Sequence, residues 1–188
     1  EITGNAALNI PTLVWGYGGY GVNESPVFSR RVVLFAEQGG IYVMANIRGG
    51  GEFGEQWHLS GNLTRKQNCF DDFQAAAQYM IGSGYTTRDK LGIIGGSNGG
   101  LLMGATFTQR PDLCKCVVSM VGIYDMLRVE LSPNGAFNVT EFGTVKDKAQ
   151  FDALFAYSPY HRVKPGVKYP AILFTTGAND PRVDPMQS

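Results

Sequence analysis

Apolar side chains gather along the chain in short runs that are typical of buried strands. Five such runs stand at residues 12–17, 41–47, 91–95, 116–121 and 171–176. They are nearly continuous in apolar residues, which is typical of parallel strands with helices on both faces. Helix-like stretches at residues 27–38, 70–81 and 101–109 lie between the first four runs. This alternation predicts an α/β fold with a doubly wound, mostly parallel sheet.

One long section interrupts the alternation. Residues 125–168 contain Pro133-Asn134-Gly135, several polar side chains and an amphipathic stretch at 147–157. We interpret the section as an excursion across the sheet that walls an active site. No interdomain linker is apparent in the sequence, so one domain is expected.

The most informative motif lies between the third strand-like run and the helix-like stretch that follows it. Residues 95–100 read Gly-Gly-Ser-Asn-Gly-Gly, which matches G-x-S-x-G in the strand–turn–helix context that this motif requires. Small neighbours are needed because the turn is tight and its backbone strained. The pattern predicts that Ser97 is a nucleophile held at the carboxyl end of a strand.

A nucleophilic serine needs a base and an acid that orients the base. In α/β-hydrolases the chain order is Ser, then Asp or Glu, then His. Asp180 follows the strand-like run at 171–176 and is the acid candidate. His58 and His161 both precede Asp180, so we expect both to be structural and the base to come from a later segment. The alternative is that one of them substitutes as the base on a different fold path.

An oxyanion hole needs two donors aimed at the developing negative charge. The backbone N–H of Asn98, next to the nucleophile, is the expected first donor. The glycine-rich loop at residues 15–21 follows the first strand-like run. Its Tyr17 offers a phenolic O–H as the second donor.

Composition excludes several other classes of function. The 16 basic and 16 acidic side chains balance, so nothing favours nucleic acid or an anionic membrane as a partner. No apolar run reaches the roughly 18 residues that span a bilayer. No metal or organic cofactor is expected. Three cysteines without a framework spacing favour a reducing, cytoplasmic location, with a periplasmic or secreted one as the alternative.

Several segments, taken in order, resemble the prolyl oligopeptidase family of serine peptidases. They are Gly16-Tyr17-Gly18-Gly19, residues 45–54 (Ala-Asn-Ile-Arg-Gly-Gly-Gly-Glu-Phe-Gly), residues 66–73 (Lys-Gln-Asn-Cys-Phe-Asp-Asp-Phe), residues 95–102, Gln109-Arg110-Pro111-Asp112-Leu113, Tyr157-Ser158-Pro159 and Asp180-Pro181-Arg182-Val183. The resemblance implies that Ser97 is the nucleophile and Asp180 the acid. It also implies that Tyr17 and Asn98 are the oxyanion donors.

The same resemblance implies a set of substrate-binding residues. Arg182 matches an arginine that holds a peptide carbonyl, and such a cation donates in a rigid fork. Val183 and Tyr20 match positions that line the pocket for the residue before the cut. Asn138 stands where the family usually has a tryptophan, and Phe137 or Phe142 would partly replace that indole.

The resemblance implies a partial catalytic domain over residues 1–188. The family's N-terminal β-propeller and the segment with the histidine are not encoded here, so the sheet is expected to be truncated at both ends. The implied activity is hydrolysis of short peptides, with proline preferred before the cut. The alternatives are an esterase or aminopeptidase-type hydrolase of the same fold, or a fragment inactive without its base. An unpaired sheet edge also predicts self-association.

Overall fold

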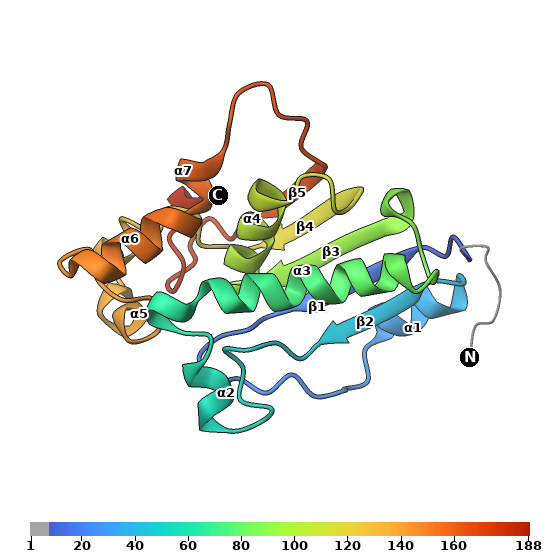
Figure 1. Cartoon of the computed structure of the whole chain (residues 1–188), viewed down its shortest axis with the longest axis horizontal. Coiled ribbons are helices and arrows are strands. Elements are labelled where there is room, and N and C mark those ends of the chain that lie inside the picture. The colour runs from blue at the N-terminus through green and yellow to red at the C-terminus, as the bar shows by residue number, and fades with distance from the viewer. Residues whose placement is uncertain (1–7) are drawn as a thin grey trace.

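The predicted strands all form, and they pair in one parallel sheet. The computed structural model describes residues 8–188 (Figure 1). The strands of the described chain are β1 (Thr12–Gly16), β2 (Ile41–Ala45), β3 (Leu91–Gly96), β4 (Cys116–Met120) and β5 (Ala171–Thr175). Their order across the sheet is β2-β1-β3-β4-β5, and every pairing is parallel. The predicted α/β class is therefore confirmed.

Helices connect the strands and build the excursion before β5. The α-helices of the described chain are α1 (Arg30–Glu37), α2 (Glu55–Leu59), α3 (Gln67–Gly82), α4 (Asn98–Gln109), α5 (Gly135–Phe142), α6 (Lys148–Tyr157) and α7 (Pro159–Arg162). Short 3-10 turns occur at Leu63–Arg65, Arg88–Lys90, Val129–Leu131 and Pro185–Gln187. The three helices predicted between the first four strands are thus present.

The two faces of the sheet differ in how well they are covered. Helices α3 and α4 pack on one face, where Val14 and Ile93 are fully buried. On the opposite face α1 lies beside β2, and an apolar groove of about 330 Å³ separates α1 from the sheet. Trp15, Ile94 and Met120 line this groove and are half-exposed. Both faces therefore carry helices, as expected, but α1 is short and packs mainly beside β2, so it covers less of its face than α3 and α4 cover of theirs.

The excursion contains a helix that the sequence did not reveal. Helix α5 begins at Gly135 and includes Asn138 and Thr140, residues that rarely favour a helix interior. It forms because Phe142 and Glu141 are buried by tertiary contacts. Helix α6 was predicted, and it begins after Asp147, whose side chain accepts the N–H of Gln150 as an N-cap.

Strand β5 lies at an edge of the sheet, and within residues 8–188 no strand pairs with its outer side. Leu173 is 57% exposed on this strand. Exposed apolar edge strands promote association between chains. We expect the chain to self-associate with increasing concentration, and Leu173→Lys to weaken that association.

Sedimentation velocity over a range of protein concentrations measures this effect. Leu131→Lys is the matched control, because Leu131 is also exposed but lies outside the sheet. A wild-type chain that stays monomeric throughout the range would contradict the expectation.

Candidate active site

Ser97 occupies the sharp turn between β3 and α4. Its backbone has φ 57° and ψ −119°, a conformation that side-chain-bearing residues rarely adopt. The Ser97 N–H donates to the carbonyl of Met120 at 2.9 Å. A Cβ on Gly99 would stand 2.7 Å from the Gly16 carbonyl oxygen, so only glycine fits there. The predicted strand–turn–helix context is present, and Ser97 is half-buried at the carboxyl end of β3.

The loop after β1 packs directly on this turn. Strands β1 and β3 are neighbours, which brings Tyr17 to the same sheet edge as Ser97. The Asn98 side-chain nitrogen donates to the Tyr17 carbonyl at 2.6 Å. A Cβ on Gly19 would lie 2.5 Å from the Asn98 side chain. The backbone N–H of Asn98 is the first of helix α4 and has no acceptor inside that helix.

The Tyr17 phenol is held in its protonated form. Burial raises the pKa of Tyr17 above its usual value of 10.0, and the negative charge of Glu141 raises it further. A hydrogen-bonding interaction with the Ser97 side chain lowers the pKa and offsets part of this rise. At neutral pH Tyr17 therefore keeps its proton and can act as a hydrogen-bond donor at this edge of the sheet.

Asp180 follows β5 at this same edge of the sheet, since β5 pairs with β4 and β4 with β3. One carboxylate oxygen of Asp180 accepts the backbone N–H groups of Arg182 at 2.9 Å and Val183 at 3.0 Å. These two bonds lower the pKa of Asp180, because they favour its charged form. The carboxylate is thus ionised and oriented by its own turn.

Arg182 and Val183 line the same small pocket but differ in how far they are exposed. The Arg182 side chain is exposed, and its positive charge adds to the two backbone hydrogen bonds in lowering the pKa of Asp180. Val183 is buried and lines a small pocket together with Asn138. The turn after β5 therefore supplies an exposed cation and a buried apolar side chain.

The predicted aromatic residues form one cluster around Tyr20. The Tyr20 ring stacks on Phe137 with centroids 5.3 Å apart and meets Phe142 edge-on at 5.7 Å. Its phenol donates to the Asn138 side-chain oxygen at 2.8 Å. Phe137 is 58% exposed, whereas Phe142 is completely buried. Phe137 can therefore contact a ligand, while Phe142 supports Tyr20 from within the core and also lies 5.3 Å beneath the Lys66 ammonium.

The two histidines lie in hydrogen-bonded surroundings away from the serine. The imidazole of His58 contacts Glu141 at 2.9 Å, and that of His161 contacts the Ser158 hydroxyl at 2.9 Å. Within residues 8–188, neither histidine hydrogen-bonds to Ser97 or Asp180. The structure thus places both histidines in contacts of the kind expected for structural residues.

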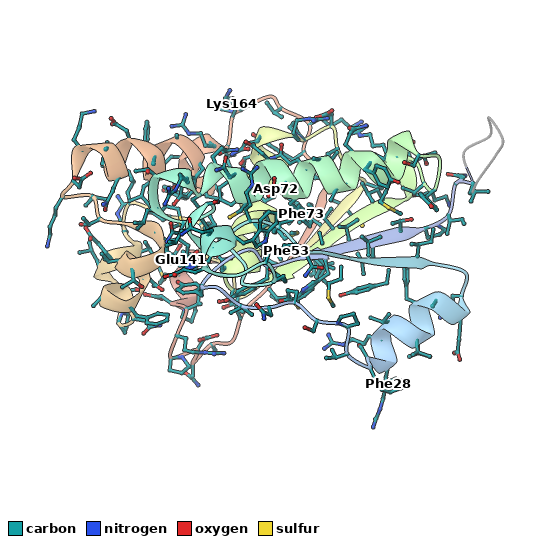
Figure 2. The ribbon with its side chains drawn as sticks, turned by 60° about the horizontal axis from the view of Figure 1, so that its bottom comes forward. Phe28, Phe53, Asp72, Phe73, Glu141 and Lys164 are labelled. Atoms are coloured by element: carbon teal, nitrogen blue, oxygen red, sulfur yellow. The ribbon has the colours of Figure 1, made fainter. Side chains whose placement is uncertain are left out.

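Sequence reasoning missed a buried ion pair beside the site. The Lys66 ammonium donates to the Glu141 carboxylate at 2.7 Å and to the Gly18 carbonyl at 2.9 Å. Both side chains are 1% exposed. They lie far apart in sequence and follow no periodic pattern, so only the fold reveals the pair. In Figure 2 Glu141 lies where α5 meets the segment that carries α2.

The described residues contain neither a cluster of metal-ligating side chains nor a helix suited to span a membrane. Within residues 8–188 no group of three or more His, Cys, Asp or Glu side chains is arranged to hold a metal ion. None of the helices in the same range is long and apolar enough to cross a membrane.

Comparisons with known proteins agree on one family. A family model described as "Prolyl oligopeptidase family" matches residues 26–188. The prolyl endopeptidase of Dictyostelium discoideum is 50% identical over 182 residues, which is 96% of this chain and 24% of that protein. The prolyl endopeptidase of Elizabethkingia miricola is 45% identical and covers 95% of this chain and 25% of its own length.

Solved structures give the same result in three dimensions. A structure from a study of two prolyl endopeptidases superimposes with a TM-score of 0.94 at 49% identity, covering 95% of this chain and 26% of that one. A prolyl oligopeptidase B from Galerina marginata, bound to a 35mer hydrolysis and macrocyclization substrate, has a TM-score of 0.93 at 36% identity and covers 95% and 25%. The chain thus spans about a quarter of the length of these relatives.

The buried ion pair leads to a prediction about stability. Lys66→Met leaves the Glu141 carboxylate buried without its cation, a change that costs about 3–5 kcal/mol in comparable cases. Lys66→Met combined with Glu141→Leu removes both charges and should restore most of the free energy of unfolding. Urea denaturation followed by circular dichroism measures both variants. A Lys66→Met variant that is as stable as the wild-type chain would contradict the expected cost of leaving Glu141 buried without its cation.

Proposed function

This chain belongs to the prolyl oligopeptidase family of serine peptidases, and from that premise we propose that it supplies the nucleophile and oxyanion site for peptide hydrolysis. Ser97 is the proposed nucleophile, and Asp180 is the proposed acid that orients the base. The Tyr17 hydroxyl and the Asn98 backbone N–H are the proposed oxyanion donors.

This proposal depends on one observation. The strained turn that contains Ser97 packs on the loop that contains Tyr17. The left-handed backbone of Ser97 aims its side chain away from the sheet, and strain of this kind is concentrated at functional sites. The pairing of β1 with β3 and the bond from the Asn98 side chain to the Tyr17 carbonyl bring the Tyr17 loop, with its phenolic donor, next to the proposed nucleophile. A serine that only capped the helix would need neither feature.

The proposed reaction proceeds through an acyl-enzyme. The Ser97 oxygen attacks the peptide carbonyl, and its proton passes to a histidine base. Tyr17 and Asn98 donate to the carbonyl oxygen as it becomes negative. The C–N bond breaks as the amine leaves with the proton from the base. Water then attacks the ester and releases the acid, which regenerates the Ser97 hydroxyl.

The base is proposed to lie outside residues 8–188. His58 and His161 are already engaged by Glu141 and Ser158, and neither reaches Ser97. The side of the Asp180 carboxylate away from its turn remains open to a partner, because both of its backbone bonds end on Oδ1.

The proposed substrate is a peptide with a small apolar residue, proline in particular, before the cut. Phe137 offers an exposed ring on the Tyr20 stack, and Val183 supplies an apolar wall. Asn138 gives the pocket an amide where an indole would add stacking area. Arg182 is exposed and near enough to Asp180 to lower its pKa, which suits the proposed contact to a substrate carbonyl.

A chimera tests the proposed nucleophile. In it, this chain replaces the matching region of the Dictyostelium discoideum prolyl endopeptidase. We expect a fluorophosphonate probe to label the chimera at Ser97, located by mass spectrometry, and not to label the isolated 188-residue chain. Ser97→Ala in the chimera is the control. A folded chimera that is unlabelled, or is labelled elsewhere, would remove Ser97 from the mechanism.

Tyr17→Phe tests the proposed oxyanion donor in the same chimera. Loss of one such donor lowers kcat by about 100- to 1,000-fold, and KM should change little because the donor acts on the transition state. Turnover of a fluorogenic peptide with proline before the cut measures both constants. An equal rise in KM with kcat retained would assign Tyr17 to substrate binding instead.

A further inference from the structure

We propose that Glu141 and Lys66 are positioning residues for Tyr17, a role that rests on the proposed function of Tyr17 as an oxyanion donor. The buried ion pair between them holds the Gly18 carbonyl and thereby sets the Tyr17 phenol against Ser97. Neither residue touches the reacting atoms, so each acts through the loop after β1.

Two successive backbone carbonyls of this loop each accept a hydrogen bond from a side chain of another element. The Tyr17 carbonyl accepts from the Asn98 side chain at 2.6 Å, and the next carbonyl, that of Gly18, accepts from Lys66 at 2.9 Å. Because peptide units are planar, anchoring two successive carbonyls fixes the peptide planes on both sides of Gly18. The Tyr17 side chain then has little freedom beyond its own rotamers.

Glu141 completes the arrangement by fixing the lysine. One carboxylate oxygen accepts from Lys66 at 2.7 Å, and the other contacts the His58 imidazole at 2.9 Å. The Lys66 ammonium is thus held between the Gly18 carbonyl and a carboxylate that is itself held from its other side. Without Glu141, the flexible side chain of Lys66 would lose the ion pair that keeps its ammonium group beside the Gly18 carbonyl.

The same carboxylate ties this loop to the proposed substrate pocket. Glu141 lies on α5, one residue before Phe142 and three after Asn138, and both of these contact Tyr20. His58 lies close to the far end of the loop, where a Cβ on Gly21 would be 3.7 Å from its ring. The Glu141 carboxylate on α5 is therefore linked through Lys66 to the start of the loop and through His58 to its end.

Stability alone does not explain such a pair. Buried ion pairs can often be replaced by apolar residues of similar volume at no loss of stability. What an apolar pair cannot supply is a directed hydrogen bond to the Gly18 carbonyl. The geometry, rather than the energy, is therefore the distinctive contribution of Lys66 and Glu141.

The experiment measures the coupling between Tyr17 and Ser97 in the 188-residue chain, independently of catalysis. Fluorotyrosine is incorporated so that the phenol titrates at lower pH, and the Tyr17 signal is assigned with Tyr17→Phe. The coupling is the change in Tyr17 pKa that Ser97→Ala causes. It is compared between the wild-type background and Glu141→Gln, which keeps the shape of the side chain. Asp72→Asn is the matched control, because Asp72 also pairs with a cation, Arg48, near this loop.

We expect the coupling to vanish in Glu141→Gln and to survive in Asp72→Asn. Loss of the Glu141 charge also lowers the Tyr17 pKa directly, but equally with and without Ser97, so this effect cancels. If Glu141→Gln does not fold, Lys66→Met with Glu141→Leu replaces it, since this pair leaves no unpaired charge. Coupling that persists in the folded variant overturns the proposal.

The proposed function and this inference can fail separately. A lost coupling together with an unlabelled Ser97 in the chimera would leave the positioning intact and reject the catalytic role. A labelled Ser97 together with retained coupling in the folded Glu141→Gln variant would support the catalytic role and reject the positioning role.

Discussion

The approach of helix α4 to the end of strand β1 is the constraint on which the site depends. The first turn of α4 comes so close to β1 that a side chain at Gly99 would collide with the Gly16 carbonyl. In the turn just before it, Ser97 has a left-handed conformation, and such strain persists only where the surrounding structure holds it in place. The body of α4 is completely buried from Asn98 to Phe107, so the strained turn rests on a rigid support. The same closeness brings Tyr17 and Asn98 into contact.

The core of the molecule is held by apolar contacts, whereas the candidate site is held by polar ones. The centre of the chain is an apolar core between the sheet and helices α3 and α4. Toward the site the buried contacts become polar, with Lys66, Glu141 and His58 joining segments that are distant in sequence. Polar contacts of this kind are directional, whereas apolar packing is not. Directional polar contacts therefore suit a site that must hold the Tyr17 phenol in one orientation.

The sequence predicted the α/β class, all five strands and the position of the serine turn. It succeeded because apolar runs and a glycine-rich motif are local signals that the backbone must obey. It missed α5, whose polar residues give no helical period, and it placed the start of α4 three residues late, at position 101 instead of Asn98. Glycines at the start of α4 hide the helix, because their propensity is low and only packing makes them helical.

The amino-acid pattern by itself determined where the strands run, where the turn with Ser97 lies and which family the chain resembles. Only the tertiary structure decided which residues meet at the carboxyl edge of the sheet. The Lys66–Glu141 pair, the Asn98 bond to Tyr17 and the Tyr20 cluster all join residues from separate elements. Such contacts follow from how strands and helices pack rather than from any spacing along the chain. A sequence read position by position therefore contains the parts of the site, and the fold sets the distances between them.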